Sequence, residues 1–308
     1  MSSAAAASPA TGLKPVPDSP GTMRRKSRSN AGRAWQRFRA NQLALVALIL
    51  ISALVVIAIG APLISRYVTN VGPNDQSLIH RFEPSSSEHW LGTDEYGRDV
   101  VTRLIYGMRV SLGVAALATL VTLIAGTVVG AAAAYYGGLT DQILMRLVDI
   151  LMAIPGINIL ILLGALFVVG PGKMAVMIAF ISWYPLARLI RSEVLSIRRR
   201  EYVEAARVMG APGHAIIRCH IFPNITHLIV VFAMGAVPAY ILTEAGMSFL
   251  GLGIRAPTPS LGNMLNSATL YLYKRPVLIL YPGLVITLIA LLVSIIGNAL
   301  RDALDPRL

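Results

Sequence analysis

Long uncharged runs of apolar residues dominate this 308-residue chain. A helix needs about 20 consecutive apolar residues to cross the hydrocarbon core of a bilayer. The runs approach or exceed that length, and only 14% of all residues are charged, against about 25% in an ordinary soluble domain. We therefore expect an all-α integral membrane protein that crosses the bilayer about six times.

The expected spans follow from the places where the uncharged runs begin and end. The second span takes only the first two thirds of its run. The fourth is the shortest, so a re-entrant segment is its alternative. The fourth carries Arg188 at its far end and the fifth carries Glu244 near one end. The predicted spans are Leu43–Ile64, Val110–Thr140, Ile150–Gly172, Met174–Ile190, Ile225–Met247 and Pro276–Leu300. The chain thus divides into a tail (1–42), a first transmembrane helix (43–64), an external loop (65–109) and a core with five further spans (110–308).

Basic residues indicate the orientation of these spans. If the N-terminus lies inside, the cytoplasmic segments carry 18 Lys and Arg residues and the external segments carry 9. Because cytoplasmic loops are enriched in Lys and Arg, both termini are predicted to be cytoplasmic. The net charge of +12 is explained in this way, and no nucleic-acid partner is expected.

The N-terminal tail has two parts. Residues 1–21 are rich in Ala, Ser and Pro and are expected to be disordered. Residues 23–39 are basic, with Trp35 and Phe38 between the charges, which predicts a short helix at the membrane surface. A nucleic-acid patch is the alternative. A cleaved signal peptide is disfavoured, because the polar region before the first apolar run is too long.

The expected cytoplasmic loop, 188–224, is long enough to form structure of its own. Good helix formers precede Gly210, where a helix is expected to end in a left-handed residue, and Pro212 forbids simple continuation. A second short helix should follow at about 213–221 and end at Pro223. The loop is therefore predicted to be a helix-turn-helix on the membrane surface.

Two alanines in this loop, Ala205 and Ala206, are expected to form a small-residue face that another protein can approach closely, with Glu204 adding one charge. The pattern resembles the EAA loop of ABC importer permeases. The family usually has Leu before the final Pro, where this chain has the equally large and apolar Phe222. The matching residues are Glu204, Ala205, Ala206, Gly210, Ile221 and Pro223.

A second resemblance narrows the family to the C permeases of dipeptide, oligopeptide and nickel importers. The segments Leu242–Gly253 and Trp35–Leu43 are similar to that subfamily, so the resemblance covers nearly everything after about residue 30. It is carried most clearly by a signature in the expected external loop. The signature residues are Trp90, Gly92, Asp94, Gly97, Arg98 and Asp99.

The resemblance implies a fold, a set of partners and a mechanism. The fold would be MetI-like, the type I importer permease fold. A second, B-type permease subunit would complete the pore, and two ATPase subunits beneath it would bind ATP and Mg. The EAA loop would sit in a groove on an ATPase, and an extracytoplasmic binding protein would deliver a peptide. The membrane would be the plasma membrane of a bacterium or archaeon.

The chain itself is not expected to be an enzyme or to hold a cofactor or metal. It contains no phosphate-binding loop, since Gly170–Lys173 has the wrong spacing. It also lacks Gly-x-Ser-x-Gly and His-Glu-x-x-His motifs. His214, Cys219 and His220 are close in sequence, but they are expected to be surface or interface residues rather than metal ligands.

Several charged residues allow more than one interpretation. Glu244 either lines the pore, where it could sense the amino terminus of a substrate, or makes a structural hydrogen bond to a neighbouring helix, which we favour. Asp149 and Arg146 lie three residues apart and are expected to pair on one helix face. Asp94, Arg98 and Asp99 should tie the external loop to itself or to the binding protein.

Two other functions compete with peptide import. Nickel import is the nearest, but the histidines lie in loops or near the expected cytoplasmic face rather than along a metal pathway through the spans. A self-sufficient secondary transporter is the second, but such proteins tend to carry internal repeats, and this chain shows none. Peptide import is therefore the main hypothesis.

Overall fold

The computed structural model describes residues 30–304, which fold into helices and connecting loops. Within this range there is no β-strand, only one isolated bridge between Thr93 and Asp99. The helices are α1 Asn30–Ala40, α2 Gln42–Ile59, α3 Ala61–Tyr67, η1 Leu78–His80, α4 Val100–Tyr136, α5 Gly138–Ala153, α6 Gly156–Leu166, α7 Pro171–Phe180, α8 Trp183–Arg198, α9 Glu201–Val208, α10 Gly213–Ile216, α11 Phe222–Phe249, α12 Leu261–Thr269 and α13 Val277–Leu304.

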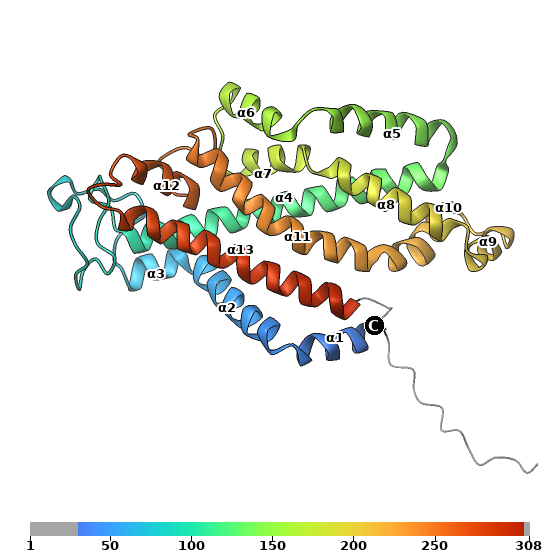
Figure 1. Ribbon diagram of the computed structural model, residues 1–308, viewed down its shortest axis with the longest axis horizontal. Helices are drawn as coiled ribbons and strands as arrows, with labels where there is room; N and C mark the ends of the chain where they lie inside the picture. The colour runs from blue at the N-terminus through green and yellow to red at the C-terminus, as the bar shows by residue number, and fades with distance from the viewer. Residues whose placement is uncertain (1–29, 305–308) are drawn as a thin grey trace, which may run out of the picture.

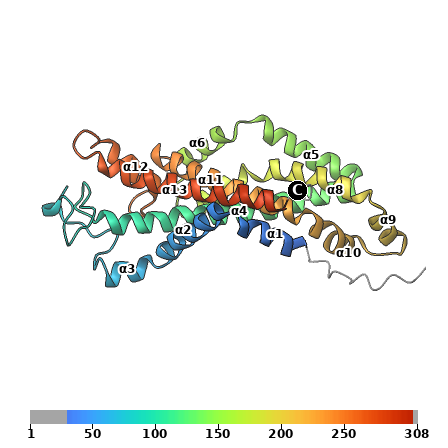
Figure 2. The same ribbon diagram turned by 60° about the horizontal axis from the view of Figure 1, so that its bottom comes forward.

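The long helices run roughly along one axis of an elongated bundle (Figure 1). α9 and α10 lie at one end, which we call the α9 end. α3, the loop before α4 and α12 lie at the opposite end, which we call the α12 end. Figure 2 shows the same separation from another direction. The chain thus places its two most structured loop regions at opposite ends of the bundle.

The number of spans agrees with the prediction. Four helices are long and apolar enough to cross a membrane, and two bent helix pairs raise the number to six if each pair is one span. The four long helices are α2, α4, α13 and the continuous helical segment Gly213–Phe249, which ends with α11. The bent pairs are α5 with α6 and α7 with α8. The described chain is therefore an all-α, multi-pass membrane protein.

The helix of the second span begins earlier than the predicted span, at Val100 and not near Val110. The side chain of Asp99 caps the new start by accepting a hydrogen bond from the backbone N–H of Thr102 (2.7 Å). Arg103 lies in the added turns and is buried, with its charge compensated by Asp94 (3.3 Å). A charged residue therefore marks no helix end here.

The helix of the third span begins before the predicted span and is broken. α5 starts at Gly138, so residues 141–149, which we counted with the cytoplasmic segments, are helical. α5 and α6 meet at an angle of 78°. The break falls at Ile154, which adopts an extended conformation (φ −100°, ψ 126°), because the ring of the following Pro155 disfavours a helical conformation there.

Two other spans also differ from the prediction. The first is interrupted at Gly60, where α2 gives way to the short α3, which has a proline in its first turn. The fourth consists of α7 and α8, which meet at 45°, and α8 continues to Arg198 rather than ending at Ile190. The C-terminal half of α8 keeps a buried apolar face, so the charged residues there do not end the helix.

The second helix of the expected cytoplasmic loop does not end at Pro223. A π turn, Ile217–Ile221, joins α10 to α11, and Pro223 lies in the first turn of α11. Proline is tolerated there because its missing N–H needs no partner within the helix. The prediction failed because Pro223 was taken as a helix stop.

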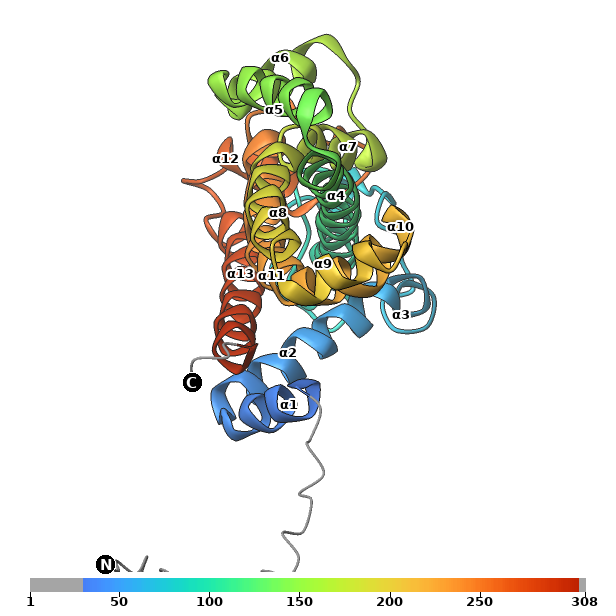
Figure 3. The ribbon, with the colours of Figure 1, turned by 90° about the vertical axis from the view of Figure 1, so that its right-hand side faces the viewer.

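The largest buried apolar cluster lies between α4, α7, α11 and α13, and a second lies between α4, α8 and α11. Gly126 of α4 packs against Leu186, and a Cβ at Gly126 would lie 2.8 Å from the Leu186 Cβ. One turn further on, Gly130 contacts the backbone of Ala187. Seen down the long axis, α4, α8 and α11 lie between α5 and α6 on one side and α1 and α2 on the other (Figure 3).

The basic part of the N-terminal tail includes a helix, α1, as expected. Trp35 and Phe38 stack with their ring centroids 5.9 Å apart. Phe38 is buried in a cluster with the last turns of α13, whereas Trp35 is half exposed. The expected disorder of residues 1–21 falls outside the described residues.

Candidate functional site

The α9–α10 loop has the helix-turn-helix shape that the sequence predicts. α9 ends in a Schellman motif, in which Ala211 N–H donates to Ala206 O (3.1 Å) and Gly210 N–H to Arg207 O (3.0 Å). Gly210 has a φ of +83°, a conformation that glycine adopts without strain. Pro212 then caps α10. The sharp turn between the two helices is thus fixed by backbone bonds.

The six residues predicted for this loop divide into an inner and an outer set. Ala206 and Ile221 are buried in a cluster that also contains residues of α4, α8 and α11. The expectation that Ala206 shares an exposed face with Ala205 was therefore wrong, since α9 turns Ala206 inward. The exposed residues are Glu204, Ala205, Gly210 and Pro223.

Two exposed apolar residues at the tip of the loop were missed. Val208 is 88% exposed and Met209 is 81% exposed. They directly precede Gly210, so they lie at the tip that α9 forms with the turn. Two apolar residues beside a helix-ending glycine in an otherwise polar loop were the signal that could have identified them. Exposed apolar side chains in such a cluster are typical of a contact surface.

The loop is braced against α4. Arg207 lies over the ring of Tyr135 at 6.0 Å, and Gly213 approaches the same ring so closely that a Cβ would lie 2.8 Å from it. Cys219 is exposed. Within residues 30–304, no three His, Cys, Asp or Glu side chains are grouped closely enough to hold a metal ion.

The external signature forms the loop before α4, at the α12 end. Gly92 and Gly97 both have positive φ, +76° and +71°. A Cβ at Gly97 would overlap the carbonyl oxygen of Ser77, and a Cβ at Gly92 would overlap that of Glu83. The two glycines therefore allow this loop to pack directly against the preceding segment.

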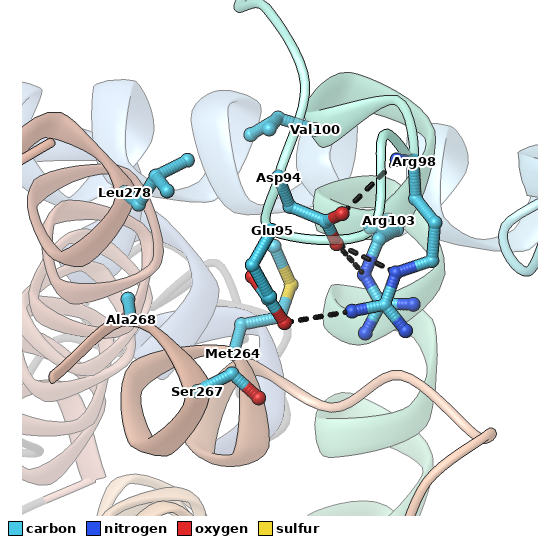
Figure 4. Close-up of a pocket in the computed structure, with 9 residues that line it drawn as sticks. All are labelled: Asp94, Glu95, Arg98, Val100, Arg103, Met264, Ser267, Ala268 and Leu278. Atoms are coloured by element: carbon cyan, nitrogen blue, oxygen red, sulfur yellow. Dashed lines mark hydrogen bonds and ion pairs between the residues drawn. The ribbon is translucent and has the colours of Figure 1, made fainter. Parts of the chain in front are cut away.

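Asp94 is the centre of a buried ionic cluster in this loop (Figure 4). Its carboxylate accepts hydrogen bonds from the backbone N–H groups of Tyr96 (2.9 Å) and Arg98 (3.0 Å). It also pairs with the Nε atoms of Arg98 (2.6 Å) and Arg103 (3.3 Å). Arg98 further pairs with Glu95 (3.0 Å). The prediction that Asp94 and Arg98 tie the loop to itself is confirmed.

Glu95 and Arg103 complete this cluster, and both were missed. Burial raises the pKa of the Glu95 carboxyl, the neighbouring Asp94 charge raises it further, and Arg98 and Arg103 oppose the shift. The cluster faces Met264 and Ala268 of α12 (Figure 4). The signal for Arg103 was its position one helical turn after Asp99, but only the extension of α4 brings it to Asp94.

The other signature residues have separate positions. Asp99 is buried and caps α4, and its second oxygen contacts His89 Nδ1 (3.0 Å). Trp90 is 56% exposed and lines a surface cavity with Val68 and Val101. The signature thus combines a buried structural core with one exposed aromatic residue.

Glu244 lies in α11 near the α12 end and has no exposed surface. Its carboxylate accepts hydrogen bonds from the hydroxyls of Ser111 in α4 (2.6 Å) and Ser248 in α11 (2.8 Å). The hydrogen bond to a neighbouring helix that we favoured is therefore present. Ser111 and Ser248 were not singled out, because serines in apolar spans carry no distinctive pattern.

The predicted pair between Asp149 and Arg146 was wrong. Asp149 instead pairs with Arg188 of α8, and both side chains are about half exposed. A second pair joins the same two helices, since Arg191 Nε contacts Asp141 Oδ1 at 2.5 Å. The packing of α8 against α5 brings these arginines within reach, which sequence spacing along α5 alone does not reveal.

The sequence matches known proteins over nearly the whole chain, and the fold matches a solved structure over two thirds of it. Residues 126–308 match the family described as binding-protein-dependent transport system inner membrane component. Residues 29–84 match the N-terminal transmembrane domain of oligopeptide transport permease C. The MetNI methionine ABC transporter, solved in inward-facing conformations, superposes with a TM-score of 0.53 at 18% identity, covering 66% of this chain and 96% of that chain. The expected MetI-like fold is thus confirmed.

Curated relatives agree. The dipeptide transport system permease protein DppC of Bacillus subtilis is 38% identical over 288 residues, 93% of this chain and 89% of that protein. The oligopeptide transport system permease protein OppC of the same species is 36% identical over 275 residues, 89% of each chain. The glutathione transport system permease protein GsiD of Pectobacterium atrosepticum is 38% identical over 274 residues, 89% of this chain and 90% of that protein. The chain belongs to the family of binding-protein-dependent transport system inner membrane components.

Proposed function

We propose that this chain is one permease subunit of an ABC importer for dipeptides or short oligopeptides. The observation that carries the proposal is the α9–α10 loop, a braced helix-turn-helix with an exposed tip, in a chain of this family. The relatives described above are named for dipeptides, oligopeptides and glutathione, which are all peptides. Their names therefore favour peptide over nickel as the substrate.

The proposed partners follow from what the chain has at each end. A B-type permease subunit completes the translocation path, because one bundle of this kind provides half of it. Two ATPase subunits bind ATP and Mg and receive the α9–α10 loop in a surface groove. Glu204 and Ala205 are exposed there, and the apolar tip at Val208 and Met209 supplies surface to be buried in the groove.

The orientation follows from the same assignment. ATP is cytoplasmic, so the α9 end faces the cytoplasm and the α12 end faces outward, where a solute-binding protein delivers the peptide. Both termini are then cytoplasmic, in agreement with the excess of Lys and Arg in the segments on that side. The membrane is the plasma membrane of a bacterium or archaeon.

The mechanism is a rigid-body switch. When the two ATPases close on ATP, they move the α9–α10 loops of the paired permeases together. Each loop is braced on α4 and continuous with α11, so the bundle tilts between an inward-facing and an outward-facing arrangement. The permease therefore contributes the path and the motion, and its partners contribute the ATP chemistry.

Two substitutions in the loop test this function in the complete complex with its binding protein. Glu204→Lys reverses an exposed charge on the contact face. Gly210→Pro removes the N–H bond to Arg207 and forbids the positive φ. Both variants are expected to insert and assemble but to import less labelled dipeptide per ATP, by about tenfold, in proteoliposomes.

Asp302→Lys is the matched control, because Asp302 is an exposed acid near the end of α13 and outside the α9–α10 loop. It should import dipeptide like the wild type. Normal import by both loop variants would contradict the role of the loop. Import by the purified chain alone, without an ATPase, would overturn the whole proposal in favour of a self-sufficient transporter.

A further inference from the structure

α11 and the helical turns before it form one rod between the two ends of the bundle. Helical structure runs from Gly213 to Phe249 over 37 residues without a sharp break, a length of about 55 Å at 1.5 Å per residue. The rod begins in the α9–α10 loop and ends beside α12 (Figure 1). A displacement of the loop therefore reaches the α12 end through a single element.

Glu244 lies near the far end of this rod and is fully buried. Its carboxylate is held by two hydroxyls, Ser111 Oγ at 2.6 Å and Ser248 Oγ at 2.8 Å. No ion pair to Glu244 is found within residues 30–304. A carboxyl group buried among apolar spans without a cation is energetically costly, which marks Glu244 as a candidate functional residue.

Each of the two serines also accepts a hydrogen bond from a backbone N–H of another segment. Ser111 Oγ accepts a hydrogen bond from the N–H of Leu261, the first residue of α12 (3.3 Å). Ser248 Oγ accepts one from the N–H of Ile254, in the segment that leads to α12 (3.1 Å). The Glu244 carboxylate thus connects α11 to α4 and, through one serine each, to the start of α12 and its approach.

Close backbone packing surrounds this connection. Gly262 of α12 lies so near α11 that a Cβ would be 2.6 Å from Ala245 Cα, directly next to Glu244. Gly107 of α4 lies near the start of α12, where a Cβ would be 3.2 Å from the carbonyl carbon of Ser260. α12 therefore packs closely against the backbones of both helices, and it cannot slide past either one without breaking the hydrogen bonds.

We propose that Glu244 is a positioning residue that locks α4, α11 and α12 into one moving body. A displacement of the α9–α10 loop is then delivered through the rod to α12, on the outer side of the membrane. This inference rests on the proposed function, because the partner ATPases supply the displacement. It assigns Glu244 to the transmission of motion and not to contact with the peptide.

The test uses the complete complex in proteoliposomes and compares Glu244→Ala and Ser111→Ala with the wild type. Thr243→Ala is the matched control, because the Thr243 hydroxyl donates a hydrogen bond to Ala239 O within α11 and to no other helix among residues 30–304. Dipeptide uptake per ATP is measured first. Distances between spin labels at Leu120→Cys in α4 and Leu270→Cys after α12 are then measured without nucleotide and with ATP, after Cys219→Ser removes the single native cysteine.

The wild type and Thr243→Ala should give one narrow label distance that is the same in both nucleotide states. Glu244→Ala should broaden the distance and lower uptake per ATP by about tenfold, while ATP hydrolysis continues; Ser111→Ala should act in the same direction. A narrow distance and normal uptake per ATP in assembled Glu244→Ala would overturn the lock. If that variant does not assemble, Ser111→Ala decides by the same criteria. If the wild type imports no peptide, the proposed function fails, and the label distance still tests the lock.

Discussion

At the scale of single residues, the Asp94 carboxylate holds the loop before α4 in its conformation. It has two backbone and two guanidinium partners, and hydrogen bonds to charged groups are stronger than those between neutral ones. Removing one member of such a buried cluster leaves the others uncompensated, which costs about 3–5 kcal/mol. The cluster therefore works as a unit, and burial raises the pKa of its Glu95 member.

The raised pKa of the buried Glu95 carboxyl should make the stability of the protein depend on pH. Because burial raises its folded-state pKa above the ordinary value of 4.5, the folded state binds a proton that the unfolded state has lost in the pH range just above 4.5. The stability contributed by Glu95 is therefore present at low pH and is lost as pH rises through the folded-state pKa. Glu95→Gln should remove this contribution.

The measurement is the thermal unfolding midpoint of the detergent-solubilised protein between pH 4.5 and 8. The midpoint of the wild type relative to Glu95→Gln should rise as pH falls. Glu88→Gln, at an exposed position in the same loop, should follow the wild type. Parallel midpoint curves for the wild type and Glu95→Gln would show that the buried carboxyl does not titrate with folding.

At this scale the sequence predicts the residues that belong to a recognisable motif, and it does not predict residues outside such a motif. Asp94 and Arg98 belong to a recognisable signature, and their contact was predicted correctly. Ser111 lies 133 residues from Glu244, in a span where nothing in the sequence distinguishes it from other small residues. Asp149 pairs with Arg188 of α8 instead of with a residue of its own helix. Contacts between distant helices depend on packing, which local spacing does not encode.

At the scale of elements, uncharged run length located the spans but not their breaks or ends. α4 includes Arg103 because Asp94 compensates its charge, and α11 includes Pro223 because the proline lies in a first turn. The break between α5 and α6 is attributable to Pro155, which the sequence displays and which was read as part of a continuous span. Helix ends thus follow capping and compensation more than hydropathy.

The packing of α4 on α8 depends on glycine. A Cβ at Gly130 would overlap the carbonyl oxygen of Ala187, so Gly130→Ala should push the helices apart and destabilise the protein by about 1–3 kcal/mol. Gly113→Ala is the matched control in the same helix, because nothing lies within 4 Å of its Cβ position. That change should stabilise α4 by about 0.5–1 kcal/mol.

Thermal unfolding of the two glycine variants in detergent separates these effects. Gly130→Ala should lower the unfolding midpoint, and Gly113→Ala should leave it unchanged or raise it. Equal midpoints for the two variants would mean that α4 and α8 can separate slightly without loss, and that the close approach at Gly130 contributes little.

At the scale of the whole molecule, the bundle separates two structured ends. The α12 end carries the ionic cluster and the Glu244 connection, and the α9 end carries the exposed tip. α4 and the rod that includes α11 reach from one end to the other, each 37 residues long. This length exceeds the about 20 residues that the hydrocarbon core requires, so both elements extend beyond the membrane and connect what lies on its two sides.

The proposed orientation predicts on which side each end can be labelled. Ile79, in η1 at the α12 end, is 91% exposed, and Asp302 is exposed at the other end of α13. With Cys219→Ser as background, Ile79→Cys should react with a membrane-impermeant maleimide only in right-side-out vesicles. Asp302→Cys should react only in inverted vesicles, because in the proposed orientation that end, with the excess of Lys and Arg, is cytoplasmic. Labelling after detergent treatment controls for the reactivity of each thiol.

Both thiols reacting from one side would contradict a bundle that spans the bilayer between these positions. The reversed pattern would place the α9 end outside, away from ATP, and would remove the basis for coupling through the α9–α10 loop.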